Sequence, residues 1–369
     1  MKLRYKILSG VGVVLVAAVA SMAIVMSHTS PCDSASAITP VAGPTMKAVV
    51  RQCYGPPDVM QVVDIAKPTP GEHQVLVKVH AASLNPLDWH NVEGTPYLIR
   101  MDAGYGKPHD LRLGVDFAGT VEAVGEHVTR FKPGDEVFGG KSGALAEYVA
   151  VNDDRAIAIK PANVSFEQAA AVPIAAVTAL QALRDVGQLK AGQRVLINGA
   201  SGGVGTFAVQ IAKALGADVT GVCSTKNMDM VRAIGANHVI DYTREDFTQG
   251  DQRYDLIVDN VETHSLSEYK RVLTPTGTYV LVGSTTPYKW LGFLAKPLAG
   301  WIASPFTKQN VKLVLADLHA QDLDQLAQWM QSGAVVPVID RSFKLEESAE
   351  ALRYLERGHA KGKVLVTLP

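Results

Sequence analysis

The pattern of apolar and polar positions separates this chain into an N-terminal appendage and regions with two different rhythms. Between about residues 46 and 165, short segments alternate apolar with polar residues and are bounded by glycine or proline, which is typical of half-buried β-strands. The expected strands cover residues 47–51, 74–80, 119–125, 135–139 and 146–151. We therefore predict a half-open, barrel-like β domain over residues 46–169.

From about residue 165 the rhythm changes to apolar strands that alternate with helical segments. The expected strands cover residues 194–198, 218–223, 238–242, 254–259 and 278–283. This order predicts a doubly wound parallel sheet with helices on both faces over residues 170–316. The tail, residues 317–369, contains a predicted helix over 321–331 and strands over 335–340 and 363–368, and we expect it to return to the first domain.

The first 45 residues have neither rhythm. The stretch from Ile7 to Met26 carries no charged residue and is about as long as the roughly 20-residue helix that crosses a bilayer. We predict a membrane-spanning helix within residues 1–26, with a cleaved secretory signal as the alternative, and a linker over residues 27–45. A core helix fits poorly because the segment is apolar on all sides. Three basic residues precede the run, and the positive-inside rule would place the folded part on the side away from the cytoplasm. We leave the side of the membrane undecided, for the reason given below.

Composition and charge exclude several classes of protein. With 47% hydrophobic and 19% charged residues among 369, the chain is too apolar to be disordered. Lys and Arg total 35 against 36 Asp and Glu, so the basic surface of a nucleic-acid binder is missing. The cysteines, Cys32, Cys53 and Cys223, are scattered, which predicts neither a disulfide framework nor a four-cysteine zinc lobe.

The most informative stretch covers residues 194–216, where an apolar strand leads into a glycine-rich turn and then a helix. Three of its glycines, spaced three residues apart, allow a tight turn, close approach to a pyrophosphate and close packing of the helix on the strand. The start of the helix offers N–H groups to phosphates, so we predict a dinucleotide site, with a purely structural turn as the alternative. The turn residues expected to bind the cofactor are Gly199, Ser201, Gly202, Gly203, Val204 and Gly205.

The end of the next strand indicates which dinucleotide is bound. An NAD site would place Asp or Glu there to bind the ribose hydroxyl, whereas this chain continues from Cys223 to Ser224 and Lys226. A lysine at this position can pair with a 2′-phosphate, so we predict NADPH. The alternative is that Lys226 is an ordinary solvated side chain.

Two further strand ends are expected to face the cofactor. Asn260 and Val261 follow the fourth strand of the second domain, and Gly283 and Ser284 follow the fifth. Ligands of open parallel sheets lie at the carboxyl ends of the strands, so we expect the nicotinamide and its ribose there.

The glycine turn and the stretches at 81–88, 113–121, 131–139 and 362–364 resemble the zinc-free quinone oxidoreductases (zeta-crystallin-like) of the medium-chain dehydrogenase/reductase superfamily. The resemblance covers residues 46–369. It implies a GroES-like first domain, a Rossmann second domain, NADPH as cofactor and a homodimer. It also implies that Tyr242 joins Lys226 at the 2′-phosphate and that Lys363 contributes to the cofactor site.

The resemblance also bears on metals and catalysis. Zinc-dependent members of the superfamily bind zinc through a Cys and a His at positions where this chain has Asn85 and Val115, which implies that no metal is bound. Asn85 is expected to donate a hydrogen bond to the acceptor oxygen, Asp88 to orient a water or substrate, and Tyr97 to line the site or donate a proton. A turn, a cap and a packing role are the respective alternatives.

Hydride transfer without a metal favours acceptors that delocalise the incoming charge, such as quinones and α,β-unsaturated carbonyls. We therefore predict an NADPH-dependent reductase of such compounds. A nucleotide-binding interaction protein without turnover and a zinc-free alcohol or carbonyl dehydrogenase are the alternatives. The cytosolic NADPH pool conflicts with a folded part placed outside the cytoplasm, and the sequence does not resolve that conflict.

One segment departs from the family's pattern. Residues 285–306 carry two Trp, two Phe and several aliphatic residues, interrupted by Lys and Pro. A segment resting on a membrane, a lid over the acceptor site and a subunit contact all fit this composition, and we favour membrane contact.

Overall fold

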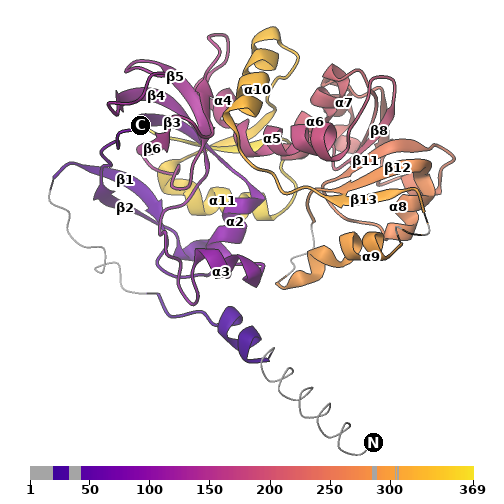
Figure 1. Ribbon diagram of the computed structural model, residues 1–369, viewed down its shortest axis with the longest axis horizontal. Coiled ribbons are helices and arrows are strands. Elements are labelled where there is room, and N and C mark those ends of the chain that lie inside the picture. The colour runs from indigo at the N-terminus through magenta and orange to yellow at the C-terminus, as the bar shows by residue number, and fades with distance from the viewer. Residues whose placement is uncertain (1–19, 33–42, 285–288, 304, 306) are drawn as a thin grey trace, which may run out of the picture.

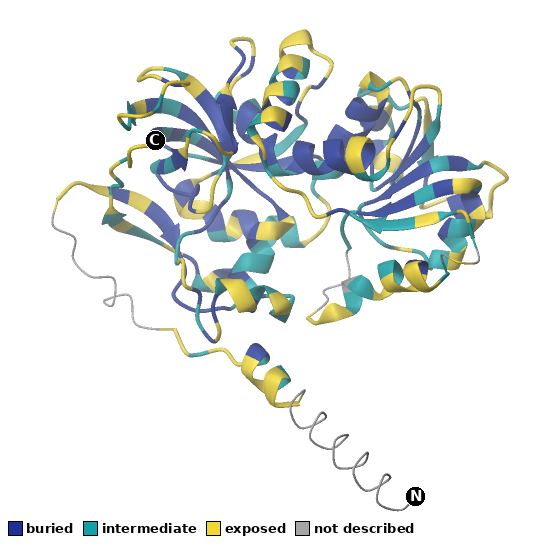
Figure 2. Cartoon of the chain, in the orientation of Figure 1, coloured by how far each residue is buried: buried dark blue, intermediate teal, exposed yellow. Residues whose placement is uncertain are grey.

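The computed structural model describes residues 20–32, 43–284, 289–303, 305 and 307–369. Two domains lie side by side, each built around its own sheet, and the N-terminal segment extends from the lower edge near α3 (Arg100–Ala103) (Figure 1). The cores of both domains are formed by their central strands and the helices packed on them (Figure 2).

The first domain is mainly antiparallel. A two-stranded sheet pairs β1 (Thr45–Val50) with β2 (Gln61–Ala66). A larger sheet has the order β14-β15-β3-β4-β5-β7, with β6 paired to β3. Its strands are β3 (Gln74–Leu84), β4 (Asp116–Val124), β5 (Glu136–Gly140), β6 (Tyr148–Asn152), β7 (Ile157–Ile159), β14 (Ile339–Lys344) and β15 (Lys363–Thr367). Its helical segments are η2 (Pro57–Val59), α2 (Pro86–Glu93), η3 (Tyr97–Ile99), α3, α4 (Phe166–Ala170), η9 (Leu345–Glu347) and α11 (Ser348–Glu356).

The second domain is a six-stranded parallel sheet with the order β10-β9-β8-β11-β12-β13. Its strands are β8 (Arg194–Asn198), β9 (Asp218–Cys223), β10 (His238–Asp241), β11 (Tyr254–Asp259), β12 (Leu273–Leu281) and β13 (Asn310–Leu313). The chain runs outwards from β8 to β10, returns to β11, and then runs outwards in the other direction. The direction in which the chain crosses the sheet therefore reverses between the neighbouring strands β8 and β11, and doubly wound sheets bind their ligands at the carboxyl ends of the strands at such a switch point.

Helices cover both faces of this sheet. They are α5 (Pro173–Gln181), η4 (Ala182–Val186), α6 (Gly203–Ala214), η5 (Thr225–Asn227), α7 (Met228–Ala233), η6 (Phe247–Gln249), α8 (Leu266–Val272), η7 (Leu291–Leu294) and α9 (Ala295–Ala303). The helix α10 (Ala320–Ser332) packs on β7 of the first domain and on α5. Seven consecutive residues of α6, from Thr206 to Ala212, are buried, which fits a helix packed between the sheet and α5. The two predicted rhythms thus correspond to the mainly antiparallel strands of the first domain and the parallel sheet of the second.

The predicted membrane-spanning helix is wrong. Among the described residues, none of the helices has the length and apolar character needed to traverse a bilayer. The described end of the apolar run is a helix over residues 20–27, and its Met26 side chain is only 6% exposed. Met26 is buried against protein, whereas Ile24 and Val25 of the same turn are exposed. Hydropathy alone cannot distinguish burial in protein from contact with lipid. Residues 1–19 lie outside the described residues, and anchoring by a single N-terminal helix is not supported.

A disulfide joins Cys32 to Cys53, with their Cα atoms 4.9 Å apart. Residues 28–32, which were expected to belong to a linker, therefore lie against the first domain, where Ser30 N–H donates to the carbonyl of Gly106. The scattered spacing of the cysteines gives no indication of this bond, because the partners meet only through the tertiary fold. Cys223 is buried and unpaired.

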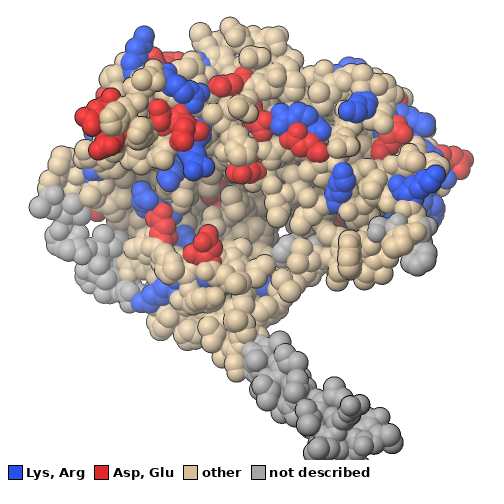
Figure 3. Space-filling model, in the orientation of Figure 1, with Lys and Arg blue, Asp and Glu red and all other residues tan. Residues whose placement is uncertain are grey.

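Surface charge agrees with the composition. On the face shown in Figure 3, Lys and Arg side chains are interspersed with Asp and Glu rather than gathered in one basic area. No surface typical of nucleic-acid binding is visible on that face.

Candidate functional site

The glycine turn joins β8 to α6 and depends on two of its glycines. Gly199 has φ +77°, a conformation that side chains disfavour. A Cβ on Gly205 would lie 2.0 Å from the carbonyl oxygen of Gly199, so the helix approaches the strand too closely for any side chain there. The turn places the N-terminus of α6 at the open edge of the sheet, with Ser201 and Val204 beside it, and the first N–H groups of a helix have no partner within it.

The loop after β11 lies directly beside this turn. A Cβ on Gly199 would lie 3.0 Å from a methyl group of Val261. Asn260 donates from Nδ2 to the carbonyl of Asn198 at 2.8 Å, while its buried Oδ1 has no hydrogen-bond partner. A buried amide oxygen without a partner is costly unless a ligand supplies a donor. The two loops therefore meet at the switch between β8 and β11, as the sequence predicts.

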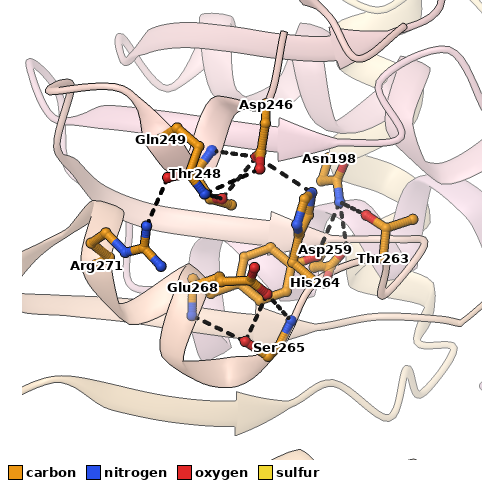
Figure 4. Close-up of polar contacts among 11 residues, drawn as sticks. Asn198, Asp246, Thr248, Gln249, Asp259, Thr263, His264, Ser265, Glu268 and Arg271 are labelled. Carbon is orange, nitrogen blue, oxygen red and sulfur yellow. Dashed lines mark hydrogen bonds and ion pairs between the residues drawn. The ribbon is translucent and has the colours of Figure 1, made fainter.

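A buried carboxylate, Asp259, shapes the loop after β11. Its Oδ1 accepts from Asn198 Nδ2 at 3.0 Å and from the backbone N–H groups of Val261 and Glu262 at 3.2 and 3.0 Å. Its Oδ2 accepts from the hydroxyl of Tyr279 at 2.7 Å. Figure 4 shows Asp259 and Asn198 together on the sheet beside the surrounding polar contacts. Asp259 thereby holds Glu262 at φ +57° and is a positioning residue that sequence reasoning missed.

The predicted 2′-phosphate corner lies at the ends of β9 and β10. Ser224 directly follows β9, Lys226 lies in the short helix η5 just after it, and Tyr242 directly follows β10. The backbone N–H of Tyr242 donates to the carbonyl of Cys223, so the two strand ends are adjacent. Lys226 is exposed and Tyr242 is 59% exposed, so both side chains are accessible to a ligand at this edge.

A cavity of about 350 Å³ lies between the two domains. The second domain contributes the carboxyl ends of β12 and β13, including Gly283 and Ser284, and the first domain contributes α2 and η3. Its lining is largely apolar: Trp89, His90, Pro96, Leu98, Ile99, Glu262, Leu281, Val282, Gly283, Ser284, Leu313, Val314 and Leu315. We call this cavity the acceptor cleft.

Three side chains of the acceptor cleft have a buried polar atom without a hydrogen-bond partner. These atoms are Trp89 Nε1, His90 Nδ1 and Glu262 Oε2. Burial lowers the pKa of His90, which favours the neutral imidazole. The other carboxylate oxygen of Glu262 pairs with Lys296 of α9 at 3.3 Å.

A buried polar cluster lies where the last strand passes beneath the glycine turn. Lys363 Nζ donates to Asn85 Oδ1 at 2.5 Å and lies 3.5 Å from Asp116 Oδ2. Asn85 Nδ2 donates to the same Asp116 oxygen at 2.8 Å. The aliphatic part of Lys363 lies close to Gly203, because a Cβ on that glycine would be 3.3 Å from Lys363 Cδ. The cluster therefore connects the first domain to the cofactor turn.

The same cluster shows what Asn85 and Asp88 contact. Asn85 caps α2, and its backbone N–H donates to Asp88 Oδ2 at 2.8 Å, which completes a capping box. Burial, together with the neighbouring Asp116, raises the pKa of Asp88 to about 7. Burial lowers the pKa of the Lys363 ammonium, an effect that Asp116 opposes. Both ends of the Asn85 amide thus have partners inside the protein.

Most predicted site residues converge, and some functional residues were missed. The turn residues, the two residues after β11, and Gly283 and Ser284 after β12 lie along one edge of the sheet. Tyr97 lies in η3, where its neighbours Leu98 and Ile99 line the acceptor cleft. Asp116 and Glu262 were not predicted. A charged residue at the start of an apolar strand was the available signal for Asp116, and nothing in the sequence indicates Glu262.

One candidate group for a metal ion occurs among the described residues. It consists of Glu72, His73 and His127, all exposed, with ligand atoms within 4.8 Å of one another. The group lies at the start of β3, whereas Asn85 directly follows the end of that strand. These residues are therefore separate from the acceptor cleft.

Comparisons with known proteins agree with this geometry. Residues 71–161 match the alcohol dehydrogenase GroES-like domain, and residues 234–366 match the zinc-binding dehydrogenase family. Mitochondrial NAD(P)H oxidoreductase RTN4IP1 of Mus musculus is 38% identical over 329 residues, covering 80% of this chain and 82% of the relative. Trans-enoyl reductase pgmF of Aspergillus terreus is 38% identical over 320 residues, covering 81% of this chain and 87% of the relative. The solved quinone oxidoreductase of Coxiella burnetii superposes with a TM-score of 0.77 at 30% identity, covering 88% of this chain and all of that one.

The fold and these relatives place the molecule in an oxidoreductase superfamily. The chain belongs to the medium-chain dehydrogenase/reductase superfamily, among its quinone oxidoreductase-like members.

Proposed function

We propose that this protein is an NADPH-dependent, zinc-independent reductase of quinones or α,β-unsaturated carbonyls. The observation that carries the proposal is the apolar acceptor cleft that opens at Gly283 and Ser284, on the same sheet edge as the glycine turn. Relatives named as NAD(P)H oxidoreductase, trans-enoyl reductase and quinone oxidoreductase support it. The homodimer that the family resemblance implies stays a prediction.

The cofactor site fits a nicotinamide dinucleotide. Gly202 leaves room for a pyrophosphate to approach the backbone, since a Cβ there would meet nothing closer than 3.5 Å, and the buried Asn260 Oδ1 needs a donor of the kind that a ribose or carboxamide supplies. The reduced cofactor supplies the hydride. The protein's part is to hold the acceptor between η3 and the ends of β12 and β13, where the apolar walls exclude water.

NADPH is proposed over NADH because of the side chains at the ends of β9 and β10. Lys226 and Tyr242 are both exposed there. The nearby Asp241 is buried and accepts hydrogen bonds from the hydroxyls of Thr225 and Thr243, so its carboxylate is already occupied. A lysine at this edge favours a 2′-phosphate over a ribose hydroxyl.

The donor set argues against zinc at the family's metal position. Val115 offers no ligand atom, and the amide oxygen of Asn85 faces the ammonium of Lys363. A cation placed there would repel that ammonium. An acceptor that delocalises charge over a conjugated system needs no Lewis acid, which is the reason for proposing quinones and enones.

The three residues that the sequence predicts to be catalytic are proposed to have different roles. Tyr97 is proposed as a wall of the acceptor cleft, since its neighbours in η3 line the cavity. Asn85 and Asp88 are proposed to act through the polar cluster, where they fix Lys363 beneath the glycine turn.

Steady-state oxidation of NADPH with a panel of quinones, enones and saturated ketones tests the function. We expect turnover with the first two classes and little with the third. Turnover of saturated ketones alone would favour a dehydrogenase, and no turnover with any acceptor despite tight NADPH binding would favour an interaction protein.

The substitution Lys226→Ala tests the choice of cofactor. Losing a charge-assisted contact worth about 1.5–3 kcal/mol should raise the KM for NADPH roughly 10- to 100-fold. The KM for NADH should stay unchanged. Lys190→Ala is the matched control, because Lys190 is an exposed lysine just before β8, at the opposite edge of the same sheet. Equal effects of Lys226→Ala on both cofactors would contradict the 2′-phosphate assignment.

A further inference from the structure

The segment from Met26 to Cys32, which we call the strap, is fastened to the first domain at several points. Cys32 forms the disulfide with Cys53, and Ser30 N–H donates to the carbonyl of Gly106 at 3.0 Å. Thr29 and Gly106 form an isolated parallel bridge. The lower part of Figure 1 shows this segment beside α3.

Arg100 connects the strap to the end of α2. Its Nη1 lies 3.2 Å from the carbonyl oxygen of Met26, 2.8 Å from that of His28 and 3.2 Å from Thr29 Oγ1. Its Nε donates to the carbonyl of Gly94 at 2.7 Å, and its Nη2 donates to that of Glu93 at 3.2 Å. The side chain is only 2% exposed, so one buried guanidinium joins two backbone segments.

Two aromatic rings extend this connection from the disulfide to the acceptor cleft. The guanidinium lies 4.4 Å from the ring centre of Tyr54, which follows Cys53, and 4.7 Å from that of Tyr97 in η3. Burial raises the pKa of Tyr54, whose hydroxyl donates to the carbonyl of Gly104. The sequence of contacts is therefore disulfide, Tyr54, Arg100 and Tyr97.

Tyr97 also reaches the second domain at the mouth of the cleft. Its backbone N–H donates to the carbonyl of Lys289 at 2.8 Å. Its ring meets the ring of Trp290 edge-on, with centres 4.9 Å apart. The residues adjacent to Tyr97, namely Pro96 and Leu98, line the cleft itself.

We propose that the strap is a redox-locked brace of the acceptor cleft. With the Cys32–Cys53 bond formed, the strap keeps Arg100 fixed and thereby holds η3 against the second domain. A dithiol reductant breaks the S–S bond by supplying two electrons and two protons, and is itself oxidised to a disulfide. The freed strap no longer contacts Arg100. Because Arg100 then holds η3 less firmly against the second domain, binding of the acceptor weakens. The cofactor turn is unaffected because the strap makes none of the contacts that shape it.

The state of the cysteines is established first. Peptide mass mapping of protein purified without reductant should find Cys32 and Cys53 linked and Cys223 as a free thiol. Two free thiols at Cys32 and Cys53 would overturn the proposal.

The coupling is then tested by amide hydrogen exchange, which needs no catalytic activity. The samples are oxidised protein, protein that has been reduced and alkylated, and the Cys32→Ser variant. Exchange over residues 94–106 should become roughly tenfold faster in the second and third samples, because the strap's release lowers the cost of local opening. Cys223→Ser is the matched control and should match the wild type. Unchanged exchange over 94–106 after reduction would overturn the proposal.

The effect on the acceptor rests on the proposed function. Reductant is removed before the assay, because thiols and phosphines add to quinones and enones. The KM for the acceptor should rise roughly tenfold in Cys32→Ser, while the Kd for NADPH, measured by nicotinamide fluorescence, stays the same. An equal rise in both constants would contradict a brace confined to the acceptor side. If the wild type reduces no acceptor, the proposed function fails, while the exchange experiment still decides whether the strap braces η3.

Discussion

Asp88 should make the stability of this protein depend on pH in an unusual direction. Its pKa is raised from 3.8 to about 7 in the folded state, chiefly by burial, so the folded protein binds this proton more tightly than the unfolded chain does. Linkage then makes the free energy of unfolding fall as the pH rises from about 4 to about 7. The pKa of Asp88 differs by about three units between the unfolded and folded states, which corresponds to about 4 kcal/mol in the free energy of unfolding. This stabilisation is fully present at low pH and is lost by pH 8.

The substitution Asp88→Asn isolates this effect. An Asn side chain does not ionise, and its amide oxygen still accepts the hydrogen bond from the backbone N–H of Asn85 that closes the capping box. The variant should therefore gain stability over the wild type as the pH rises. Between pH 5 and pH 8 the difference should grow by about 3 kcal/mol.

Urea unfolding of both proteins at the two pH values measures this difference, and comparing variant with wild type cancels the other titrating groups. Asp154→Asn is the control, since Asp154 is exposed on the turn before β7. A constant gap between Asp88→Asn and wild type across this range would refute the reasoning, because it would mean that Asp88 is already ionised at pH 5.

Two further substitutions test the cofactor edge. Gly205→Ala places a Cβ 2.0 Å from the carbonyl oxygen of Gly199, so the Kd for NADPH should rise roughly hundredfold, whereas Gly250→Ala, which meets nothing closer than 3.8 Å, should leave it unchanged. Similar fluorescence titrations of the two variants would count against the turn as the pyrophosphate site. Asp259→Asn weakens charge-assisted hydrogen bonds, including that from Tyr279, and should cost about 2 kcal/mol of stability together with NADPH affinity. Loss of stability in thermal unfolding without any loss of NADPH affinity would show that Asp259 does not shape the cofactor loop.

The elements governed by local pattern were predictable from the sequence. Apolar alternation and βαβ rhythm identify both sheets, since side-chain periodicity reflects which face of a strand or helix is buried. The glycine turn was equally accessible, because Gly199 and Gly205 are required by backbone geometry within one short segment.

Features that depend on distant segments meeting could not be predicted in this way. Lys363 and Asn85 lie 278 positions apart in the chain, and their contact with Asp116 exists only once the last strand has joined the first sheet. Likewise, Cys32 and Cys53 show no spacing rule. The apolar run that ends at Met26 was wrongly predicted to span a membrane. Hydropathy shows that a segment is apolar but not whether its side chains contact lipid or protein, and Met26 is buried against protein.

The place of β15 in the first domain determines the order in which the molecule can be completed during synthesis. This strand lies inside the larger sheet, between β14 and β3, and covers Lys363–Thr367. Every strand of the second domain has left the ribosome earlier, since β13 ends at Leu313. The first domain's sheet therefore receives β15 only after the whole second domain has been synthesised, and the domain encoded second is the first whose strands are all available to fold.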